Sequence, residues 1–445
     1  MVLKTENLKI GINENNIIEL SRERNEPDWL LELRLKAFRK FKELEMPTWS
    51  PVFNIDYSQI KIGIKVMDKK AHSWDEVPEE IRTTIDKLGI VDAEKRFLMG
   101  SATQVEAEMI YKRIKEEIKN KGIIFESMDE AIKNHPELIK EYFGKLVSYA
   151  DNKMAALNTA CFTGGTFIYV PKNLKLDLPL QTFFLMNFEQ SGQFERSLII
   201  ADENSEVHYI EGCTAPLYTR ANLHAGVVEI FVKKNARIRF TTIQNWSKNV
   251  YNFSTKRAIV EENGHIEWID GNLGSKLTMK YPMAILKDNA SAEILSLSIV
   301  SDNQIIDAGA KILFQGKNCR ASVLSKSIVM ENANSTFRSL CKIPREASGT
   351  INIDCDSLIL SETAESHAFP THINNSPNAI IKHEAKVSYL DEAQLFYLKS
   401  KGIDEKKAKS LLILGFINPI AKTLPLEYAI ELNKLIEMAF ENERH

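Results

Sequence analysis

The central part of the chain consists of short apolar and alternating runs that predict β-strands. Residues 227–232 read VVEIFV and residues 294–300 read ILSLSIV, with many β-branched residues and few helix formers. Runs of this length, bounded by turn residues, are typical of buried strands. The strand-rich part is predicted to begin at residues 166–170 (TFIYV), after the break at Gly164 and Gly165.

A short motif recurs between these runs: asparagine, a small residue, any residue, and an apolar residue. Asparagine tolerates the left-handed conformation, so each copy predicts a corner from which a strand departs. The first five copies (positions 204, 235, 263, 289 and 318) follow one another at intervals of 26 to 31 residues, inside the range of roughly 20–50 expected for stacked repeats. The pattern predicts a parallel β-helix and leaves open an antiparallel sandwich with similar turns. The motif begins at Asn204, Asn235, Asn263, Asn289, Asn318, Asn334 and Asn378.

The two ends of the chain have helical patterns instead. After a cap segment at residues 25–28, apolar positions recur at helical spacing from Leu31 to Phe41, which predicts a helix that ends before Pro47. Further helices are predicted from Asp92 onward and over 105–111, 136–143, 391–398, 408–414 and 426–440. The prediction is therefore an N-terminal helical domain (1–155), a β-helix core (156–388) and a C-terminal helical domain (389–445). Helical ends would also cover the open edges of a solenoid.

Composition narrows the class of protein. A length of 445 residues predicts more than one structural unit, and a net charge of −3 gives no reason to expect nucleic acid as a partner. No apolar run approaches the ~20 residues of a membrane span and the start is polar, so we expect a soluble, cytoplasmic protein without a membrane partner. Five cysteines without a Cys-x-x-Cys pair fit neither a disulfide framework nor a zinc module. The chain also lacks a phosphate-binding loop and a dinucleotide fingerprint.

Five segments, spread in order over most of the chain, carry a family resemblance. They are 21–29 (SRERNEPDW), 192–196 (GQFER), 211–216 (EGCTAP), 382–385 (KHEA) and 391–397 (DEAQLFY). Together they resemble the SufB branch of the SufB/SufD family of iron–sulfur cluster assembly scaffolds. The resemblance implies a mainly β fold, a right-handed parallel β-helix between helical ends. It also implies a scaffold that is not an enzyme and that works with a SufC-type ATPase and with SufD or a second copy of SufB.

The resemblance assigns roles to two cysteines. Cys213 matches the residue that accepts sulfur as a persulfide, a reaction that requires a thiolate; the alternative is a small buried apolar residue. Cys355 matches a cluster-assembly ligand near the subunit interface, with Glu384 beside it and His383 as a weaker candidate; an ordinary surface pair is the alternative for these two. Adjacent residues on a strand point to opposite faces, so only one of His383 and Glu384 would face a given site. Cys161, Cys319 and Cys341 are predicted to be core residues.

The same resemblance associates four further residues, Asn187, Gln244, Trp246 and Lys256, with a route for sulfur through the β-helix. Gln244 and Trp246 are two residues apart, so on a strand they face the same side. A plain packing role is the alternative for Trp246. Leu185 stands where we expect arginine in relatives, which puts the route in question.

The predicted function is a scaffold of the SUF system that accepts sulfur from a donor protein, builds a transient [4Fe–4S] or [2Fe–2S] cluster and passes it to apoproteins. Related complexes can hold a reduced flavin, for which this sequence has no feature. One alternative is a SufD-like partner subunit that holds no cluster, against which Cys213 and residues 25–27 argue. A carbohydrate-active β-helix enzyme is a more distant alternative, because no acidic ladder is present.

The tail after residue 388 resembles the part of the family that docks the ATPase. Its apolar positions Leu411, Leu412, Leu414 and Phe416 exceed what one stripe of a helix needs, so the surplus could face a partner. Packing against the end of the solenoid is the alternative.

Overall fold

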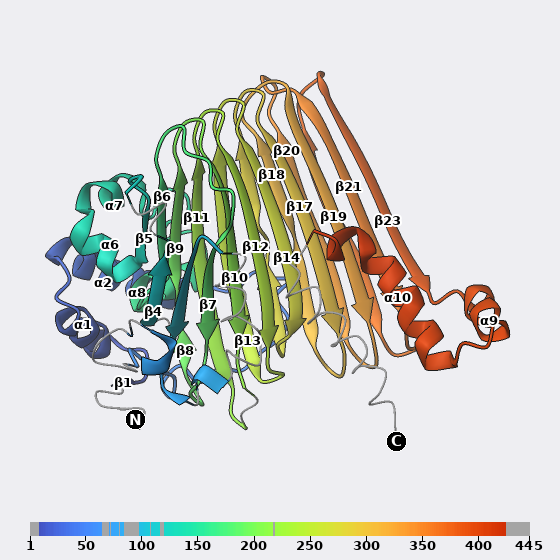
Figure 1. Ribbon diagram of the computed structural model, residues 1–445, viewed down its shortest axis with the longest axis horizontal. Helices are drawn as coiled ribbons and strands as arrows, with labels where there is room; N and C mark the ends of the chain where they lie inside the picture. The colour runs from blue at the N-terminus through green and yellow to red at the C-terminus, as the bar shows by residue number, and fades with distance from the viewer. Residues whose placement is uncertain are drawn as a thin grey trace.

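In the computed structural model the chain forms a parallel β-helix built from two long sheets (Figure 1). The structure describes residues 9–64, 71, 73–79, 81–83, 98–106, 108–115, 120–216 and 219–423. Sheet 1 has ten strands in the order β23-β21-β19-β17-β14-β12-β10-β7-β3-β4. Sheet 2 follows the path β22-β20-β18-β15-β13-β11-β9-β6-β5, with β16 and β8 beside it. Successive coils place one strand in each sheet, so the predicted mainly β solenoid is confirmed.

The strands of sheet 1 are β3 (Gly100–Val105), β4 (Glu108–Ile114), β7 (Leu180–Leu185), β10 (Glu206–Thr214), β12 (Arg237–Trp246), β14 (His265–Gly274), β17 (Ser291–Val300), β19 (Cys319–Val329), β21 (Gly349–Ile359) and β23 (Ala379–Tyr389). Those of sheet 2 are β5 (Ile124–Ser127), β6 (Thr166–Val170), β8 (Gly192–Gln193), β9 (Arg196–Ala201), β11 (Asn222–Val232), β13 (Val250–Val260), β15 (Leu277–Lys280), β16 (Met283–Leu286), β18 (Ile305–Phe314), β20 (Asn334–Ile343) and β22 (Glu365–Asn374). From β7 and β6 onward, neighbouring strands within each sheet pair in parallel. This pairing excludes the antiparallel sandwich.

Asparagines form a ladder at one corner of the coils. Asn204, Asn235, Asn263, Asn289 and Asn318 all have φ between 56° and 60°, as the repeated motif predicted. The amide of Asn235 donates to Asn204 Oδ1 at 2.9 Å, and that of Asn263 donates to Asn235 Oδ1 at 3.0 Å. Each asparagine therefore adopts the left-handed conformation of its turn and also forms a hydrogen bond to the asparagine of the neighbouring coil.

The motif fails at its last two copies. Asn334 and Asn378 are not left-handed, although strands begin at or just after them. Before β20 the left-handed position is taken by Glu331, with φ 51°. The asparagine motif predicts the strand starts there, but not the turn geometry.

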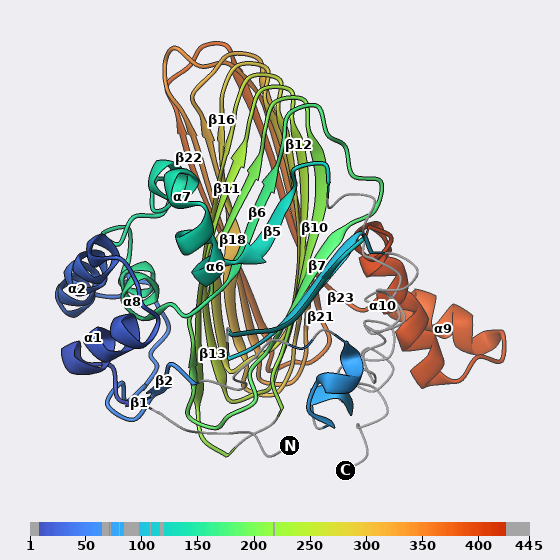
Figure 2. The same cartoon turned by 60° about the vertical axis from the view of Figure 1, so that its left-hand side comes forward.

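The N-terminal helices cover the outer face of sheet 2 (Figure 2). Helix α2 (Asp28–Glu43) packs on α8 (Lys153–Cys161), and its Phe38 and Phe41 join a cluster that includes Phe231 and Phe253 of sheet 2. Helices α1 (Glu14–Glu23), α6 (Met128–Asn134) and α7 (Pro136–Tyr142), the 3₁₀ turn η1 (Trp74–Glu76) and the hairpin of β1 (Lys9–Ile10) with β2 (Lys61–Ile62) complete this region. The helices predicted before Pro47 and over 136–143 are confirmed.

One predicted N-terminal helix is wrong. Residues 105–111 end β3 and begin β4, two antiparallel strands that close sheet 1. A positive φ at Glu106 makes the tight connection between them. Propensity favoured a helix here, but β3 pairs with β7 and β4 pairs with β3, and this pairing supplies the backbone hydrogen bonds of strands. The predicted helix from Asp92 onward begins outside the described residues, and the domain boundaries stay predictions.

At the other end, α10 (Glu405–Ala421) lies along the outer face of sheet 1 rather than over the end of the solenoid. Its buried Ile413, Ile417 and Ile420 pack on an apolar row that includes Ile269 and Leu297. Helix α9 (Glu392–Ser400) precedes it and buries no residue. The predicted helices over 391–398 and 408–414 are confirmed, and that over 426–440 lies outside the described residues.

The expectation that helices cover the solenoid edges is therefore wrong for the C-terminal end of the described chain. Strands β22 and β23 are the last of their sheets and stay largely exposed, and α9, which projects beyond the end of β23 in Figure 1, buries none of its residues. The helices instead bury the apolar outer faces of the two sheets, where rows of apolar side chains offer more surface than an edge does. No helix of the described residues is long and apolar enough to cross a membrane.

Candidate functional site in the interior of the β-helix

Cys213 lies near the end of β10, inside the β-helix. It is 3% exposed and packs in a small apolar cluster with Phe184 and Trp246. Burial raises the pKa of its thiol well above the usual range, and the Glu195 and Glu211 carboxylates raise it further. The resting side chain is therefore a protonated thiol, and sulfur exchange at this position requires a base that accepts the thiol proton.

Two rows of side chains on the interior face of sheet 1 connect Cys213 with Cys355. Parallel strands in register place paired residues side by side, and residues two apart share a face. One row starts at Cys213 and the other starts at Glu211 and ends at Cys355, and both are buried along their length. The first row is Cys213, Gln244, Asn272, Ser298, Ser327 and Ser357; the second is Glu211, Thr242, Asp270, Ser296, Ser325 and Cys355.

These rows form a polar seam through an otherwise apolar interior. The row immediately before them on the same face is apolar and includes Tyr209, Phe240 and Trp268. Small hydroxyl side chains fill the seam toward Cys355, whereas large polar and charged ones fill it near Cys213. The step from β10 to β21 spans roughly 24 Å, since neighbouring strands lie about 4.8 Å apart. The seam thus places both cysteines on one face of one sheet.

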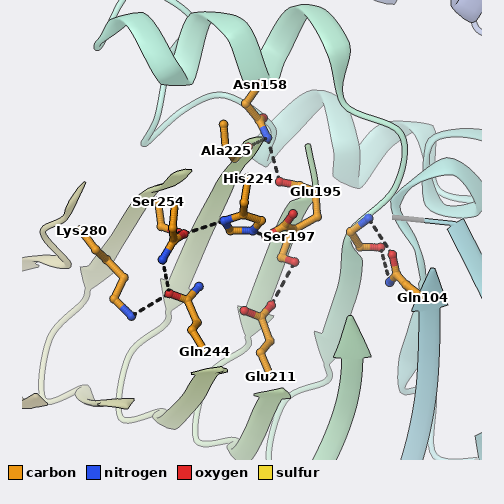
Figure 3. A network of polar contacts seen from close by, with 12 residues as sticks. Gln104, Asn158, Glu195, Ser197, Glu211, His224, Ala225, Gln244, Ser254 and Lys280 are labelled. Carbon is orange, nitrogen blue, oxygen red and sulfur yellow. Dashed lines mark hydrogen bonds and ion pairs between the residues drawn. The ribbon is translucent and has the colours of Figure 1, made fainter. Parts of the chain in front are cut away.

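Near Cys213 a hydrogen-bonded chain crosses between the sheets (Figure 3). His224 of β11 contacts Asn252 Oδ1 through Nδ1 at 2.7 Å and Glu195 through Nε2. Asn252 donates to Gln244 Oε1 at 2.9 Å, and Lys280 Nζ donates to the same oxygen at 3.3 Å. Gln244 lies beside Cys213 in the register of β10 and β12, so the chain of contacts ends next to the thiol.

Burial shifts the pKa values of two charged groups close to Cys213. Burial lowers the pKa of Lys280 to about 8, against the opposing charge of Asp270. Burial raises the pKa of Glu211 to about 7, against the opposing charge of Lys256. Both groups change charge near neutral pH, which makes them able to take up and release protons within the seam.

The residues predicted for a sulfur route are only partly brought together. Gln244, Trp246 and Lys256 face the interior and are 2–3% exposed. The Trp246 ring lies 4.7 Å from that of His224, and its Nε1 has no hydrogen-bond partner in the described part of the chain. Asn187 follows β7, is half-buried, and its backbone N–H donates to Glu106 Oε1 at 2.6 Å.

Leu185 does not face Cys213. It pairs with Thr214 in the register of β7 and β10, which places it on the opposite side of the sheet. There it packs with Val105 and Phe183 under the N-terminal segment. The residue that shares the interior face with Cys213 at this strand is Phe184.

Around Cys355 the register separates the candidate ligands. Cys355 pairs with Ala385, while Glu384 pairs with Asp354 and His383 with Ile353. His383 therefore shares the interior face with Cys355, and Glu384 points to the outer face. The His383 ring lies 5.4 Å from that of His372 in the facing sheet, and burial raises the pKa of Cys355 to about 12. Within the described ranges no three potential metal ligands gather at one point.

Sequence reasoning assigned no role to several side chains of the seam and of the hydrogen-bonded chain beside it. Glu195 and Glu211 lay within the segments that carry the family resemblance, while Asn252, Asp270 and Lys280 carried no signal at all. A charged side chain that points into the interior of a solenoid loses hydration at a high free-energy cost. Asp270 and Lys280 would therefore have stood out once the inward-facing positions of the strands were known. The three remaining cysteines, Cys161, Cys319 and Cys341, are buried as predicted.

Comparison with known proteins decides the family. The family described as "SUF system FeS cluster assembly, SufBD core domain" matches residues 183–416, and the one described as "SufBD protein N-terminal region" matches residues 18–182. The chain belongs to the SufBD family. Iron-sulfur cluster assembly SufBD family proteins of Staphylococcus epidermidis, Staphylococcus haemolyticus and Staphylococcus aureus are each 48% identical to it over 434 residues, which cover 97% of this chain and 93% of each relative. Membership removes the carbohydrate-active enzyme from the alternatives.

Proposed function

We propose that this SufBD family member is a SufB-type scaffold that accepts sulfur at Cys213 and assembles an iron–sulfur cluster at Cys355. The observation that carries the proposal is the polar seam, because it joins the two cysteines on one buried face. A structural cysteine pair would not need aligned polar side chains on the four strands between its members. Unpaired polar groups in a core are costly, so their concentration in two rows favours a functional use.

A cavity outside the seam offers a way for a sulfur donor protein to approach Cys213. It has a volume of about 420 Å³ and lies where β10, β12 and β14 end. Ala215 and Trp246 line this cavity and also pack around Cys213. A persulfide-bearing segment in the cavity would contact side chains that pack around the thiol.

At the opposite end, we propose that the open edge of β22 and β23 binds SufD or a second copy of this chain. Five large apolar side chains on these strands are 41–67% exposed, and an edge strand offers unpaired backbone groups. Cys355 lies on β21, the strand next to this edge, so a partner could complete its ligand set together with His383. The five side chains are Phe369, Ile373, Ile380, Val387 and Tyr389.

Anaerobic reconstitution separates the SufB-type role from a SufD-like one. With ferrous iron and sulfide, a SufB-type chain is expected to retain iron and acid-labile sulfide after desalting and to show charge-transfer absorbance. A cognate sulfur donor should replace free sulfide in the same assay. A folded chain that retains neither iron nor sulfide, alone or with its partner subunit, would be a SufD-like subunit and would contradict the proposal.

The ATPase partner is proposed to dock on α9. This helix buries none of its residues, and Phe396 and Tyr397 are 74% and 60% exposed. Two adjacent aromatic side chains on a helix that α10 anchors to the solenoid have the character of interface anchors. The surplus apolar residues of α10 are largely engaged instead, since Leu414 and Phe416 pack on the sheet 1 cluster, while Leu411 stays 43% exposed.

Replacing both Phe396 and Tyr397 with alanine is expected to weaken binding of a SufC-type ATPase at least about 30-fold, since one interface anchor contributes about 2 kcal/mol or more. Thermal stability should not change, because both side chains are exposed. Co-purification and titration calorimetry measure the loss, with Val52→Ala, at a fully exposed apolar residue of the N-terminal region, as the control. ATPase binding at full strength by the double variant would contradict docking on α9. Truncation before Lys401 is less informative because it uncovers the outer face of sheet 1.

A further inference from the structure

Two lysines from sheet 2 meet one carboxylate from sheet 1 inside the β-helix. Lys256 of β13 and Lys280 of β15 are 2% and 1% exposed, and Asp270 of β14 is 1% exposed. Lys280 Nζ lies 3.2 Å from Asp270 Oδ1, and Lys256 Nζ lies 3.6 Å from the same oxygen. Both contacts are ion pairs, and neither has the geometry of a hydrogen bond. The cluster therefore holds two ammonium groups around a single carboxylate oxygen.

Lys256 is the less satisfied of the two lysines. Its Nζ has no hydrogen-bond partner among the described residues and lies 4.6 Å from the centre of the Phe240 ring. Lys280, in contrast, donates to Gln244. A buried ammonium group needs hydrogen-bond acceptors to offset the loss of hydration. Two further carboxylates interact with this region electrostatically, without direct contact to either lysine. Glu211 of β10 interacts with Lys256, and Glu195, from the segment before β9, interacts with Cys213.

Further unpaired polar atoms point to the same place. Thr242 and Asn272 flank Asp270 in the seam, Thr242 as its register partner on β12 and Asn272 two residues along β14. Thr242 Oγ1 and both amide atoms of Asn272 are buried without a hydrogen-bond partner in the described structure. Native interiors leave few such groups, so a concentration of them calls for a ligand.

We propose that Lys256 and Lys280, together with Thr242 and Asn272, form a binding site for a sulfur monoanion, either the hydrosulfide ion or the terminal sulfur of a Cys213 persulfide. Asp270 is the one carboxylate within ion-pair distance of the two ammonium groups, so the direct contacts leave room for one further negative charge. Gln244 links the site to Cys213 and Asp270 lies in the row that ends at Cys355. The inference rests on the proposed function, because the site lies on the proposed path of sulfur.

Bromide is a suitable probe, since it is a monoanion that anomalous diffraction locates directly. Crystals of the full chain soaked in bromide are expected to show an anomalous peak in contact with Nζ of both lysines. Lys280→Met should lose the peak, and Asp270→Asn should strengthen it because the competing carboxylate is removed. Lys311→Met is the control: Lys311 is a half-buried lysine on the outer face of sheet 2. No peak in the wild type, or a peak that survives Lys280→Met, overturns the site.

Sulfur species are then tested by displacement. If hydrosulfide removes the bromide peak while persulfide loaded on Cys213 leaves it, the ligand is free hydrosulfide. If the persulfide removes it, and Cys213→Ser protects it from persulfide loading, the ligand is the terminal sulfur on Cys213. Bromide that resists both overturns the assignment to sulfur. None of these results depends on cluster assembly, so failure of the scaffold function would leave the anion site standing and would be seen separately in reconstitution.

Discussion

Replacing Cys355 with alanine is expected to lower the iron and sulfide retained after anaerobic reconstitution by more than roughly 10–100-fold. Loss of a residue that only hydrogen-bonds to a metal ligand already lowers metal affinity by roughly that factor, and Cys355→Ala removes a proposed ligand itself. Thiolate is the strongest iron ligand available at the end of the seam. Although burial raises the pKa of Cys355 to about 12, iron displaces the thiol proton on binding. Iron and acid-labile sulfide analysis with visible absorbance measures the effect.

Cys319→Ala is the matched control, because Cys319 is also buried in the interior of sheet 1 but lies outside the seam. Both variants remove one sulfur atom from the core, so their thermal stabilities should fall by similar amounts. His383→Ala and Glu384→Ala extend the comparison. The register places only His383 on the face of Cys355, so His383→Ala should weaken retention more than Glu384→Ala in the isolated chain. Undiminished cluster in Cys355→Ala would refute the assembly site.

Replacing Cys213 with serine is expected to abolish persulfide labelling from a cognate sulfur donor while leaving chemical reconstitution with free sulfide near the wild-type level. In the labelling step the Cys213 thiolate attacks the terminal sulfur of the donor persulfide. The donor S–S bond breaks, the donor leaves as a thiolate, and the proton released by Cys213 ends on that leaving thiol. A serine hydroxyl does not take part in this exchange, whereas the ligands around Cys355 remain intact.

Mass spectrometry of the intact protein and alkylation of the persulfide measure the labelling. Cys341→Ser, at a buried cysteine of sheet 2, serves as the control and should label normally. Equal failure of Cys213→Ser and Cys355→Ala in chemical reconstitution would show that the two cysteines do not have separate roles. Normal persulfide labelling of Cys213→Ser would place the acceptor at another cysteine.

Much of the fold was predictable because its signals are local. The left-handed asparagines at 204, 235, 263, 289 and 318 mark the corners of successive coils, and their spacing predicts the repeat. The helices at either end follow from caps and apolar spacing. The strands at residues 105–111 were mispredicted because β4 pairs with β3, and β3 in turn pairs with β7, whose residues lie 80 positions further along the chain.

For the site, the sequence determined which residue types were available and which segments match the SufBD family, including Cys213 and Cys355. Only the tertiary structure decided which of them share a face, because strand register and the inward direction of a side chain depend on pairing between coils. Register aligned Cys213 and Cys355 with two polar rows, turned Glu384 away from Cys355 and Leu185 away from Cys213, and brought Lys256 and Lys280 from one sheet to Asp270 of the other. These last contacts join residues of different strands across the interior, which a pattern read along one strand does not encode.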